Sequence, residues 1–251
     1  MNFLLHRHLA EDALDSAAAG VGAMLPDLWR IADRRVRARR AVDLDVVDAR
    51  DGALASVLAG VGHHLDADAA FHASGAFVEG ERAVGDAIAA LDVAEARLRL
   101  FAHVTWELCL DGALVRRLGV RSIQERVAAG LGDDDDAAIA RAASLHHFAR
   151  AADADGARRA AFDARMHRIL HGLATEPWIE GYATGPGVAA RVSQIRGRVG
   201  LPALEIDAAT RFGRALDGLA ARADAALDAI LVDPAYSQPT RRAPNGSTSA
   251  S

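Results

Sequence analysis

The stretch RLRLFAHVTWELCLDGALVRR, residues 97–117, decides the class of fold. Apolar residues such as Trp106, Leu108 and Leu110 occupy nearly every side of a helix built on this stretch, which is typical of a buried helix. Alanine accounts for 58 of the 251 residues, and it favours helices and gives sheets little to pack with. We therefore predict an all-α protein. The helical patterns cover residues 6–18, 53–73, 92–118, 120–130, 137–151, 157–173, 176–199 and 203–232.

Charge and cysteine content exclude several classes of function. The net charge of −5 argues against a globally basic nucleic-acid-binding protein, so we expect no DNA partner. The single cysteine, Cys109, excludes an internal disulfide and a thiolate zinc site, which leaves nitrogen and oxygen ligands for any metal. No apolar stretch comes near the roughly 20 residues that span a bilayer. The first residues do not resemble a signal peptide, and we expect a cytoplasmic protein.

Two of the predicted helices carry a stripe of three residues that are able to bind a metal. In GVGHHLDADAAFH, residues 60–72, the stripe has histidine, aspartate and histidine at i, i+4 and i+8. In FAHVTWELCLD, residues 101–111, it has histidine, glutamate and aspartate at the same spacing. This spacing places each stripe along one helix face. The residues are His64, Asp68 and His72 in the first stripe and His103, Glu107 and Asp111 in the second.

The carboxylates of the second stripe need compensation if their helix is buried. Burying Glu107 and Asp111 alone is expensive, and a divalent metal is one way to compensate them. A buried hydrogen-bond network with arginine partners is the alternative. Because two stripes match, we favour a metal that takes hard or borderline ligands.

Four further residues extend this candidate site. Asp27 follows a proline and is either a metal ligand or the N-cap of a helix. His6 and His8 are two residues apart, so at most one of them reaches a common site. His63 lies about 100° around the helix from His64. We expect His6, His8 and His63 beside the ligands rather than among them.

Several segments resemble, in order and spacing, the bacterial acyl carrier protein phosphodiesterases. They are MNFLLHRHLA, GAMLPDLWRI, GVGHHLDAD and the stretch at residues 97–117. WIEGYATGPGVAARVSQIRGR, residues 178–198, resembles the C-terminal region of that family. The likeness extends over residues 1–232.

The resemblance implies an all-α fold related to the HD-domain phosphohydrolases and a divalent metal, manganese above all. It also implies hydrolysis of the phosphodiester that joins 4′-phosphopantetheine to a serine of acyl carrier protein, which makes that protein the expected partner. The resemblance also carries site residues over one by one. The family's two N-terminal histidines fall on His6 and His8, and its early aspartate falls on Asp27. Its His-x-x-x-Asp pair falls on His64 and Asp68, and its later acidic pair falls on Glu107 and Asp111.

The sequence departs from the family pattern at three positions. His72 stands where the family has an aspartate, His103 where it has a small residue, and Gly112 where it has a histidine. These changes shift the ligand set toward nitrogen, so iron or zinc stays open beside manganese. A weaker similarity to zinc-dependent phospholipase C-like proteins, which carry comparable Pro-Asp and Gly-His-x-x-x-Asp segments, fits that shift.

Roles in phosphoester hydrolysis can be assigned to a few residues. Asp27 and Asp111 are the expected catalytic carboxylates, which bridge two ions or orient the attacking water. The arginines of RIADRRVRARR, residues 30–40, suit a phosphate or an acidic protein surface. They are equally compatible with a solvated helix face, because every basic residue of this chain is an arginine. The candidates for phosphate or partner binding are Arg30, Arg34, Arg35 and Arg37.

These observations lead to a single expectation with two alternatives. We expect one HD-domain-like, metal-dependent phosphohydrolase domain over residues 1–233. The remainder, residues 234–251, has the Pro- and Ser-rich composition of a disordered tail. The first alternative is another metalloenzyme on the same scaffold, either a phospholipase C-like hydrolase or an HD-type di-iron oxygenase. The second is a non-enzymatic helical protein whose stripes are structural.

Overall fold

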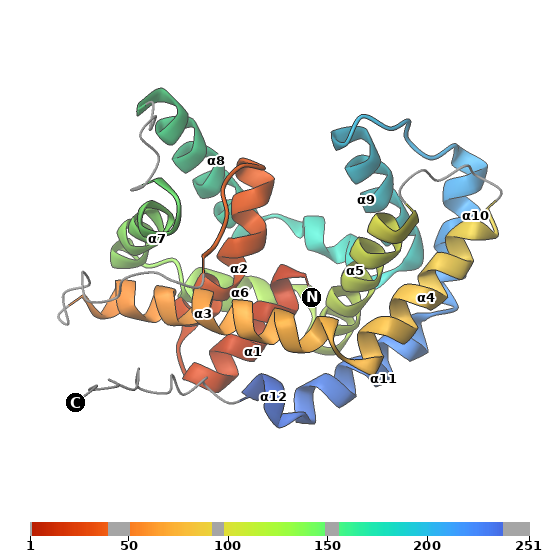
Figure 1. Ribbon diagram of the computed structural model, residues 1–251, viewed down its shortest axis with the longest axis horizontal. Coiled ribbons are helices and arrows are strands. Elements are labelled where there is room, and N and C mark those ends of the chain that lie inside the picture. The colour runs from red at the N-terminus through yellow and green to blue at the C-terminus, as the bar shows by residue number, and fades with distance from the viewer. Residues whose placement is uncertain (1, 40–50, 92–97, 149–155, 238–251) are drawn as a thin grey trace, which may run out of the picture.

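The computed structural model describes residues 2–39, 51–91, 98–148 and 156–237, and all regular secondary structure in these ranges is helical (Figure 1). The all-α prediction is therefore confirmed. None of the described helices is both long and apolar enough to pass through a membrane. The elements are α1 (Phe3–Leu14), α2 (Ala17–Ala32), α3 (Gly52–His72), α4 (Gly75–Ala89), α5 (Leu98–Leu118), α6 (Val120–Ala129), α7 (Asp133–His146), α8 (Gly156–Thr175), the 3-10 helix η3 (Pro177–Ala183), α9 (Gly185–Arg198), α10 (Ile206–Asp217), α11 (Ala220–Val232) and α12 (Pro234–Ser237).

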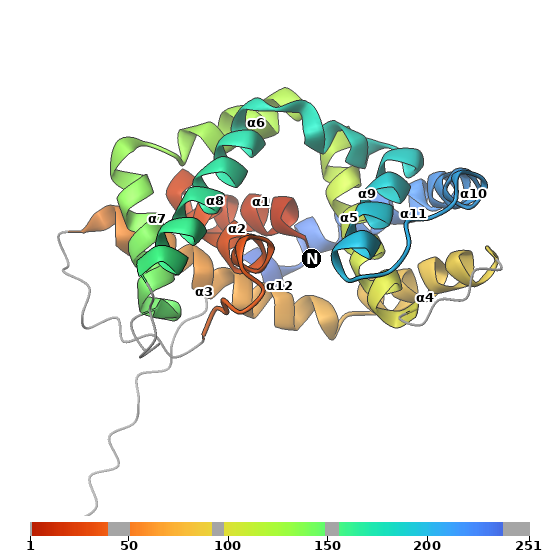
Figure 2. The ribbon, with the colours of Figure 1, turned by 90° about the horizontal axis from the view of Figure 1, so that it is seen from above.

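The first helix lies in the middle of the molecule. α1 packs against α2, α3 and α5, while α4 and α11 pack against the far side of α5. Seen from above (Figure 2), α6 and η3 lie along one edge and α3 and α4 along the opposite edge. The largest fully buried side chains, Trp29, Trp106 and Phe3, come from α2, α5 and α1. The core is therefore built around the same helices that carry the candidate ligands.

The helices differ from the sequence prediction around α2. The pattern predicts one helix over 6–18 followed by an irregular small-residue segment, but α1 ends at Leu14 and α2 runs from Ala17 through Pro26 to Ala32. Ser16 caps α2, since its side-chain oxygen accepts a hydrogen bond from the Ala19 nitrogen at 3.2 Å. Asp27 is consequently inside a helix, and the N-cap alternative for it is wrong.

Other boundaries also differ. α4 occupies a segment for which the sequence predicts no helix, and the predicted helices at 176–199 and 203–232 are each divided in two, near Thr184 and near Gly218. Parts of the predicted helices, residues 92–97 and 149–151, lie outside the described residues.

A close crossing of α2 and α3 sets the position of the first stripe. A Cβ atom on Gly22 would overlap the carbonyl oxygen of Val57, and one on Gly60 would overlap that of Ala19. Only glycine lets the two backbones approach this closely. His64 lies one turn beyond Gly60, and it is thereby held against the backbone of α2.

The last described helix, α12, covers the first four residues of the predicted tail. Tyr236 of α12 is buried, and its carbonyl oxygen accepts a hydrogen bond from Nε2 of His63 at 2.9 Å. Residues 238–251, the rest of the predicted tail, lie outside the described residues.

Candidate metal centre

Six side chains gather in two groups that could each hold a metal ion. Within each group, one potential ligand atom per residue lies within 4.8 Å of the others. The first group combines α1, α2 and α3, and the second combines α3 and α5. The first group is His6, Asp27 and His64, and the second is His72, His103 and Glu107.

The first group is buried and short of hydrogen-bond partners. His6 and His64 are 0% and 5% exposed, and their ring centroids are 3.8 Å apart. Both ring nitrogens of His6 and Oδ2 of Asp27 are buried and have no hydrogen-bond partner among the described residues. Buried polar atoms of this kind are normally paired, and one nitrogen of each histidine and one carboxylate oxygen of Asp27 lie within 4.8 Å of one another, an arrangement that suits a cation.

One hydrogen bond orients His64 for such a role. Its Nδ1 donates to the carbonyl oxygen of Ala23 at 2.8 Å, because a carbonyl can only accept. The proton is thereby fixed on Nδ1 and the lone pair of Nε2 is available to a metal. Ala23 is one turn before Asp27, so α2 provides both a ligand and the group that orients another.

The second group is more accessible and is centred on one carboxylate oxygen. Oε1 of Glu107 lies 3.1 Å from Nε2 of His103 and 3.5 Å from Nε2 of His72. The two imidazole rings are 4.8 Å apart, and the ring of Phe77 meets both of them edge-on. The side chains of both histidines are 33% exposed, so this group is open to solvent.

Asp68 joins the two groups. Its Oδ1 is 3.7 Å from Nε2 of His6, and its Oδ2 is 3.3 Å from Nδ1 of His72. His64, Asp68 and His72 all lie in α3 at the predicted four-residue spacing, and the contact between Asp68 and His72 is the one that this spacing predicts. Asp68 therefore lies between the two groups and contacts one histidine of each.

Burial sets the charge of the first group. It lowers the pKa of His6 to about 4 and that of His64 well below its ordinary value. Burial, with the nearby charges of Glu107 and Asp68, also raises the pKa of Asp27 well above its ordinary value. Burial therefore favours the neutral form of all three side chains. The imidazoles are thus ready to act as ligands, and a cation would compensate the charge of Asp27.

His72 of the second group lies between the carboxylates of Asp68 and Glu107, which favour a positive charge on it. Hydrogen bonding to Asp68 and Glu107 raises the pKa of His72 to about 9. Burial opposes ionisation of Asp68 and Glu107. The hydrogen bonds to neighbouring imidazoles have the opposite effect, and the pKa values of both carboxyl groups lie below the ordinary range. His72 is therefore protonated between two carboxylates at neutral pH.

Asp111 differs from the expectation that it is a ligand. Its two carboxylate oxygens accept hydrogen bonds from the backbone nitrogens of Leu4 and Leu5, at 3.2 and 3.0 Å. It fixes the start of α1 and belongs to neither group. The next residue, Gly112, packs so closely on η3 that a Cβ atom would overlap the carbonyl oxygen of Tyr182. The family's histidine therefore has no room at this position.

The three histidines expected beside the ligands have different positions. His6 is itself in the first group, which corrects its predicted supporting role. His8 lies in neither group and has its Nε2 3.7 Å from Oδ2 of Asp12. His63 is occupied by the carbonyl of Tyr236. As predicted, only one of His6 and His8 reaches the centre.

Sequence reasoning missed Glu81 on α4. Its Oε1 lies 3.9 Å from Nδ1 of His103 and is buried without a hydrogen-bond partner. The preceding residue, Gly80, leaves room for Trp106, since a Cβ atom there would overlap the indole ring. This packing of α4 on α5 brings Glu81 to the edge of the second group. The only sequence signal is a glutamate beside a glycine, which is too common to be informative.

The arginines after Asp27 do not converge on the metal centre. All four predicted candidates are exposed. Arg35 pairs with Asp33, with 3.2 Å between Nε and Oδ1, and Arg37 donates to the carbonyl oxygens of Val36 and Arg34. Arg40, at the end of the predicted cluster, lies outside the described residues. The four candidates are Arg30, Arg34, Arg35 and Arg37.

Comparisons of the chain with protein-family models, with curated proteins and with solved structures gave no match.

Proposed function

We propose that this protein is a metal-dependent phosphodiesterase that acts at the His/carboxylate centre on α1, α2, α3 and α5. The observation that carries the proposal is the position of Asp68, which contacts His6 of one ligand group and His72 of the other. Two neighbouring nitrogen- and oxygen-rich sites that share a carboxylate suit a pair of divalent ions.

Each described residue has a role in this proposal. His6, Asp27 and His64 would hold an ion at the buried position, and His72, His103 and Glu107 would hold one at the open position. A bound divalent ion lowers the pKa of a coordinated water toward about 7 and neutralises charge on phosphoryl oxygens. Asp27 would orient the attacking water or bridge the ions through its unpaired oxygen. Asp111 acts as a positioning residue through α1.

The substrate class follows from the resemblance. Four of the five segments similar to acyl carrier protein phosphodiesterases contribute to the centre, although they are far apart in the sequence: they supply His6, Asp27, His64 with Asp68, and Glu107. This supports manganese as the metal and the phosphodiester of 4′-phosphopantetheine on acyl carrier protein as the bond that is hydrolysed.

The first test is the metal content of the purified protein. We expect about two manganese, iron or zinc ions per chain, and a loss of at least one in His64→Ala. His63→Gln is the matched control, because this neighbouring histidine bonds to Tyr236 and belongs to neither group. A wild-type protein without stoichiometric metal, or a His64→Ala protein with unchanged metal, would contradict the proposal.

The second test separates the chemistry from the substrate. We expect the manganese-loaded protein to convert holo-acyl carrier protein to the apo form and to release phosphopantetheine, and His64→Ala to lose this activity. If the protein hydrolyses bis(p-nitrophenyl) phosphate but forms no apo-acyl carrier protein, the proposed phosphodiesterase activity stands and acyl carrier protein is excluded as its substrate. Bound iron with a mixed-valence optical band and no hydrolysis would favour the oxygenase alternative instead.

A further inference from the structure

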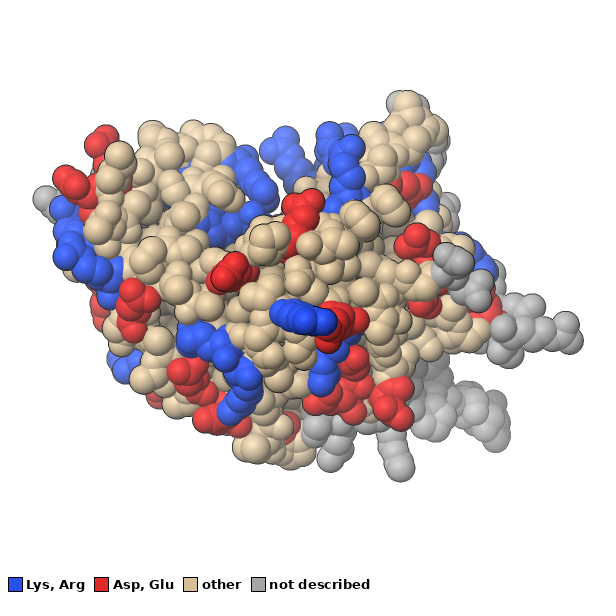
Figure 3. All heavy atoms as spheres, turned by 180° about the vertical axis from the view of Figure 1, so that it is seen from behind, with Lys and Arg blue, Asp and Glu red and all other residues tan. Residues whose placement is uncertain are grey.

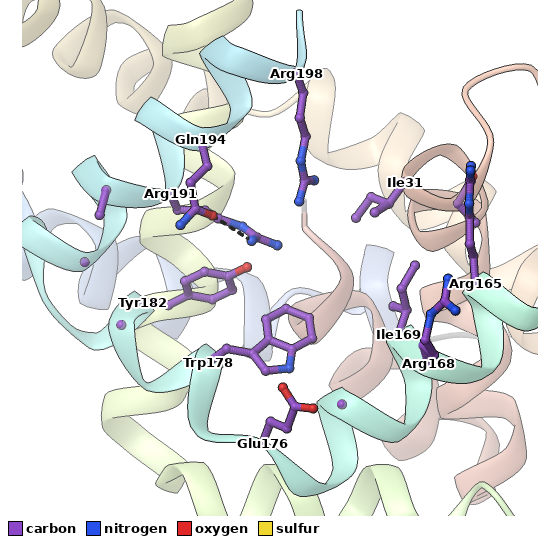
Figure 4. Close-up of a pocket in the computed structure, with 15 residues that line it drawn as sticks. Ile31, Arg165, Arg168, Ile169, Glu176, Trp178, Tyr182, Arg191, Gln194 and Arg198 are labelled. Carbon is purple, nitrogen blue, oxygen red and sulfur yellow. Dashed lines mark hydrogen bonds between the residues drawn. The ribbon is translucent and has the colours of Figure 1, made fainter. Parts of the chain in front are cut away.

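A hollow, which none of the predicted site residues lines, opens between α2, α8, η3 and α9 (Figure 4). Its volume is about 490 Å³, which is within the usual range for small-molecule pockets. Viewed from behind, arginine side chains gather on both sides of this depression (Figure 3). It begins at Ile31, one helical turn beyond Asp27 on α2. We call it the arginine pocket.

Four arginines line the arginine pocket: Arg165 and Arg168 from α8, and Arg191 and Arg198 from α9. Only one carboxylate, that of Glu176, is among the lining residues. Within the part of the chain that the structure describes, none of the four guanidinium groups forms an ion pair with a carboxylate. This contrasts with the arginines of α5, where Arg116 reaches Asp224 at 2.7 Å. In a protein of net charge −5, such an excess of positive charge is local.

A buried hydroxyl group points into the same space. Tyr182 is 2% exposed, and its hydroxyl donates no hydrogen bond to any of the described residues. Figure 4 shows this hydroxyl directed into the pocket toward Arg191 and Arg198. Burial raises the pKa of Tyr182 to about 12, so it keeps its proton at neutral pH and can donate it to an anion. An unpaired buried donor of this kind indicates a missing acceptor.

The pocket also has an apolar side. Trp178 of η3 is half-buried and lies under the guanidinium of Arg191, whose carbon is 5.4 Å from the ring centroid. Ile31 is 42% exposed although it is a large apolar residue, and Ile169 lies near it (Figure 4). A ligand that fills the space would therefore meet both a cationic and an apolar surface.

We propose that the arginine pocket binds a small molecule that carries a phosphate group next to an apolar or aromatic part. Guanidinium groups match phosphate oxygens in charge and in bidentate geometry, and the Tyr182 hydroxyl adds a neutral donor. Trp178, Ile31 and Ile169 would contact the apolar part of the ligand. The pocket volume of about 490 Å³ fits a compound of nucleotide size. This proposal requires no metal and is independent of the proposed phosphodiesterase activity.

Titration of the full-length, EDTA-treated protein with inorganic pyrophosphate tests this site alone. Trp178 is the natural reporter, because Trp29 and Trp106 are fully buried elsewhere. We expect saturable binding with a Kd below about 1 mM and a change in tryptophan fluorescence. Arg191→Gln and Arg198→Gln should each weaken binding about tenfold, since each removes a charged donor. Tyr182→Phe should weaken it several-fold.

Arg222→Gln on α11 is the matched control, because Arg222 is an exposed arginine outside the pocket. The Arg222→Gln protein should bind pyrophosphate with the affinity of wild type. Circular dichroism establishes that each variant is folded. Absence of pyrophosphate binding, or binding that the pocket variants leave unchanged, would overturn the proposal. Arginine-dependent binding of a single-stranded oligonucleotide without binding of pyrophosphate would also overturn it, and would assign the pocket to a nucleic acid.

Discussion

The carboxylate of Asp111 accepts a hydrogen bond from the backbone nitrogen of Leu5 at 3.0 Å, and this contact joins the middle of α5 to the first turn of α1. Its other oxygen accepts from the nitrogen of Leu4. The first N–H groups of a helix have no partner within the helix, so a carboxylate is favoured there both as acceptor and by the helix dipole. His6 directly follows Leu5, and the contact therefore also sets the position of a candidate ligand.

Removing this carboxylate should destabilise the fold and disturb the first ligand group. We expect Asp111→Ala to lower the free energy of unfolding by about 2–4 kcal/mol, because two buried N–H groups lose their acceptor. Urea denaturation of the metal-free protein measures this loss. A change below about 0.5 kcal/mol would show that the contact contributes little.

Asp111 should also make stability depend on pH. Burial raises its pKa from 3.8 to about 7, so between these values the folded state binds more protons than the unfolded state. Its contribution to the free energy of unfolding is therefore greatest below about pH 4 and is lost as the pH rises through about 7. Asp111→Asn cannot titrate, so the difference in stability between it and wild type should change over this range. Parallel pH profiles of the two metal-free proteins would contradict the assignment.

The close crossing of α2 and α3 gives a prediction with a built-in control. Gly60→Ala places a methyl group on the carbonyl oxygen of Ala19, and we expect a loss of at least about 2 kcal/mol in the free energy of unfolding. Gly62→Ala, two residues further on the same helix, meets no atom within 4 Å and should stabilise the protein by up to about 1 kcal/mol. Thermal unfolding measures both. Equal effects of the two substitutions would show that the crossing tolerates a side chain.

The parts of the centre that follow from helix periodicity could be predicted from the sequence. Residues four apart on a helix share a face whatever surrounds them, so the alignment of His64, Asp68 and His72 requires no tertiary information. The same holds for His103 and Glu107. Asp111 has the same spacing, but the sequence does not reveal that this end of the stripe meets the start of α1.

The remaining differences arise from tertiary packing. Glycine and Pro26 reduce the helix propensity of α2, yet the segment is helical, and its Gly22 allows close contact with α3. Glu81 reaches His103 only because Gly80 accommodates an indole ring from α5. Neither helix propensity nor residue spacing reveals the contact between α2 and α3 or the contact between Glu81 and His103. The arginine pocket likewise combines residues from four elements.

Metal binding should be favoured at higher pH. The raised pKa values of His72, about 9, and of Asp27 mean that both groups lose protons when they become ligands. We therefore expect the affinity for manganese to rise between pH 6.5 and 8.5. Calorimetric titrations in two buffers of different ionisation enthalpy measure the protons released. Binding without proton release would show that His72 is not displaced from its protonated state.

Asp68 provides the sharpest test that the two groups act as one centre. It contacts His6 through one oxygen and His72 through the other, so its loss should affect both groups at once. We expect Asp68→Asn, which keeps the shape of the side chain, to weaken manganese binding at both positions by about 10–100-fold. Asp66→Asn removes a carboxylate two residues away on α3, outside both groups, and should retain wild-type stoichiometry and affinity. Equilibrium dialysis with metal analysis measures both quantities. If Asp68→Asn loses affinity at one position only, the two groups are independent sites, and the dinuclear centre on which the proposed activity rests is contradicted.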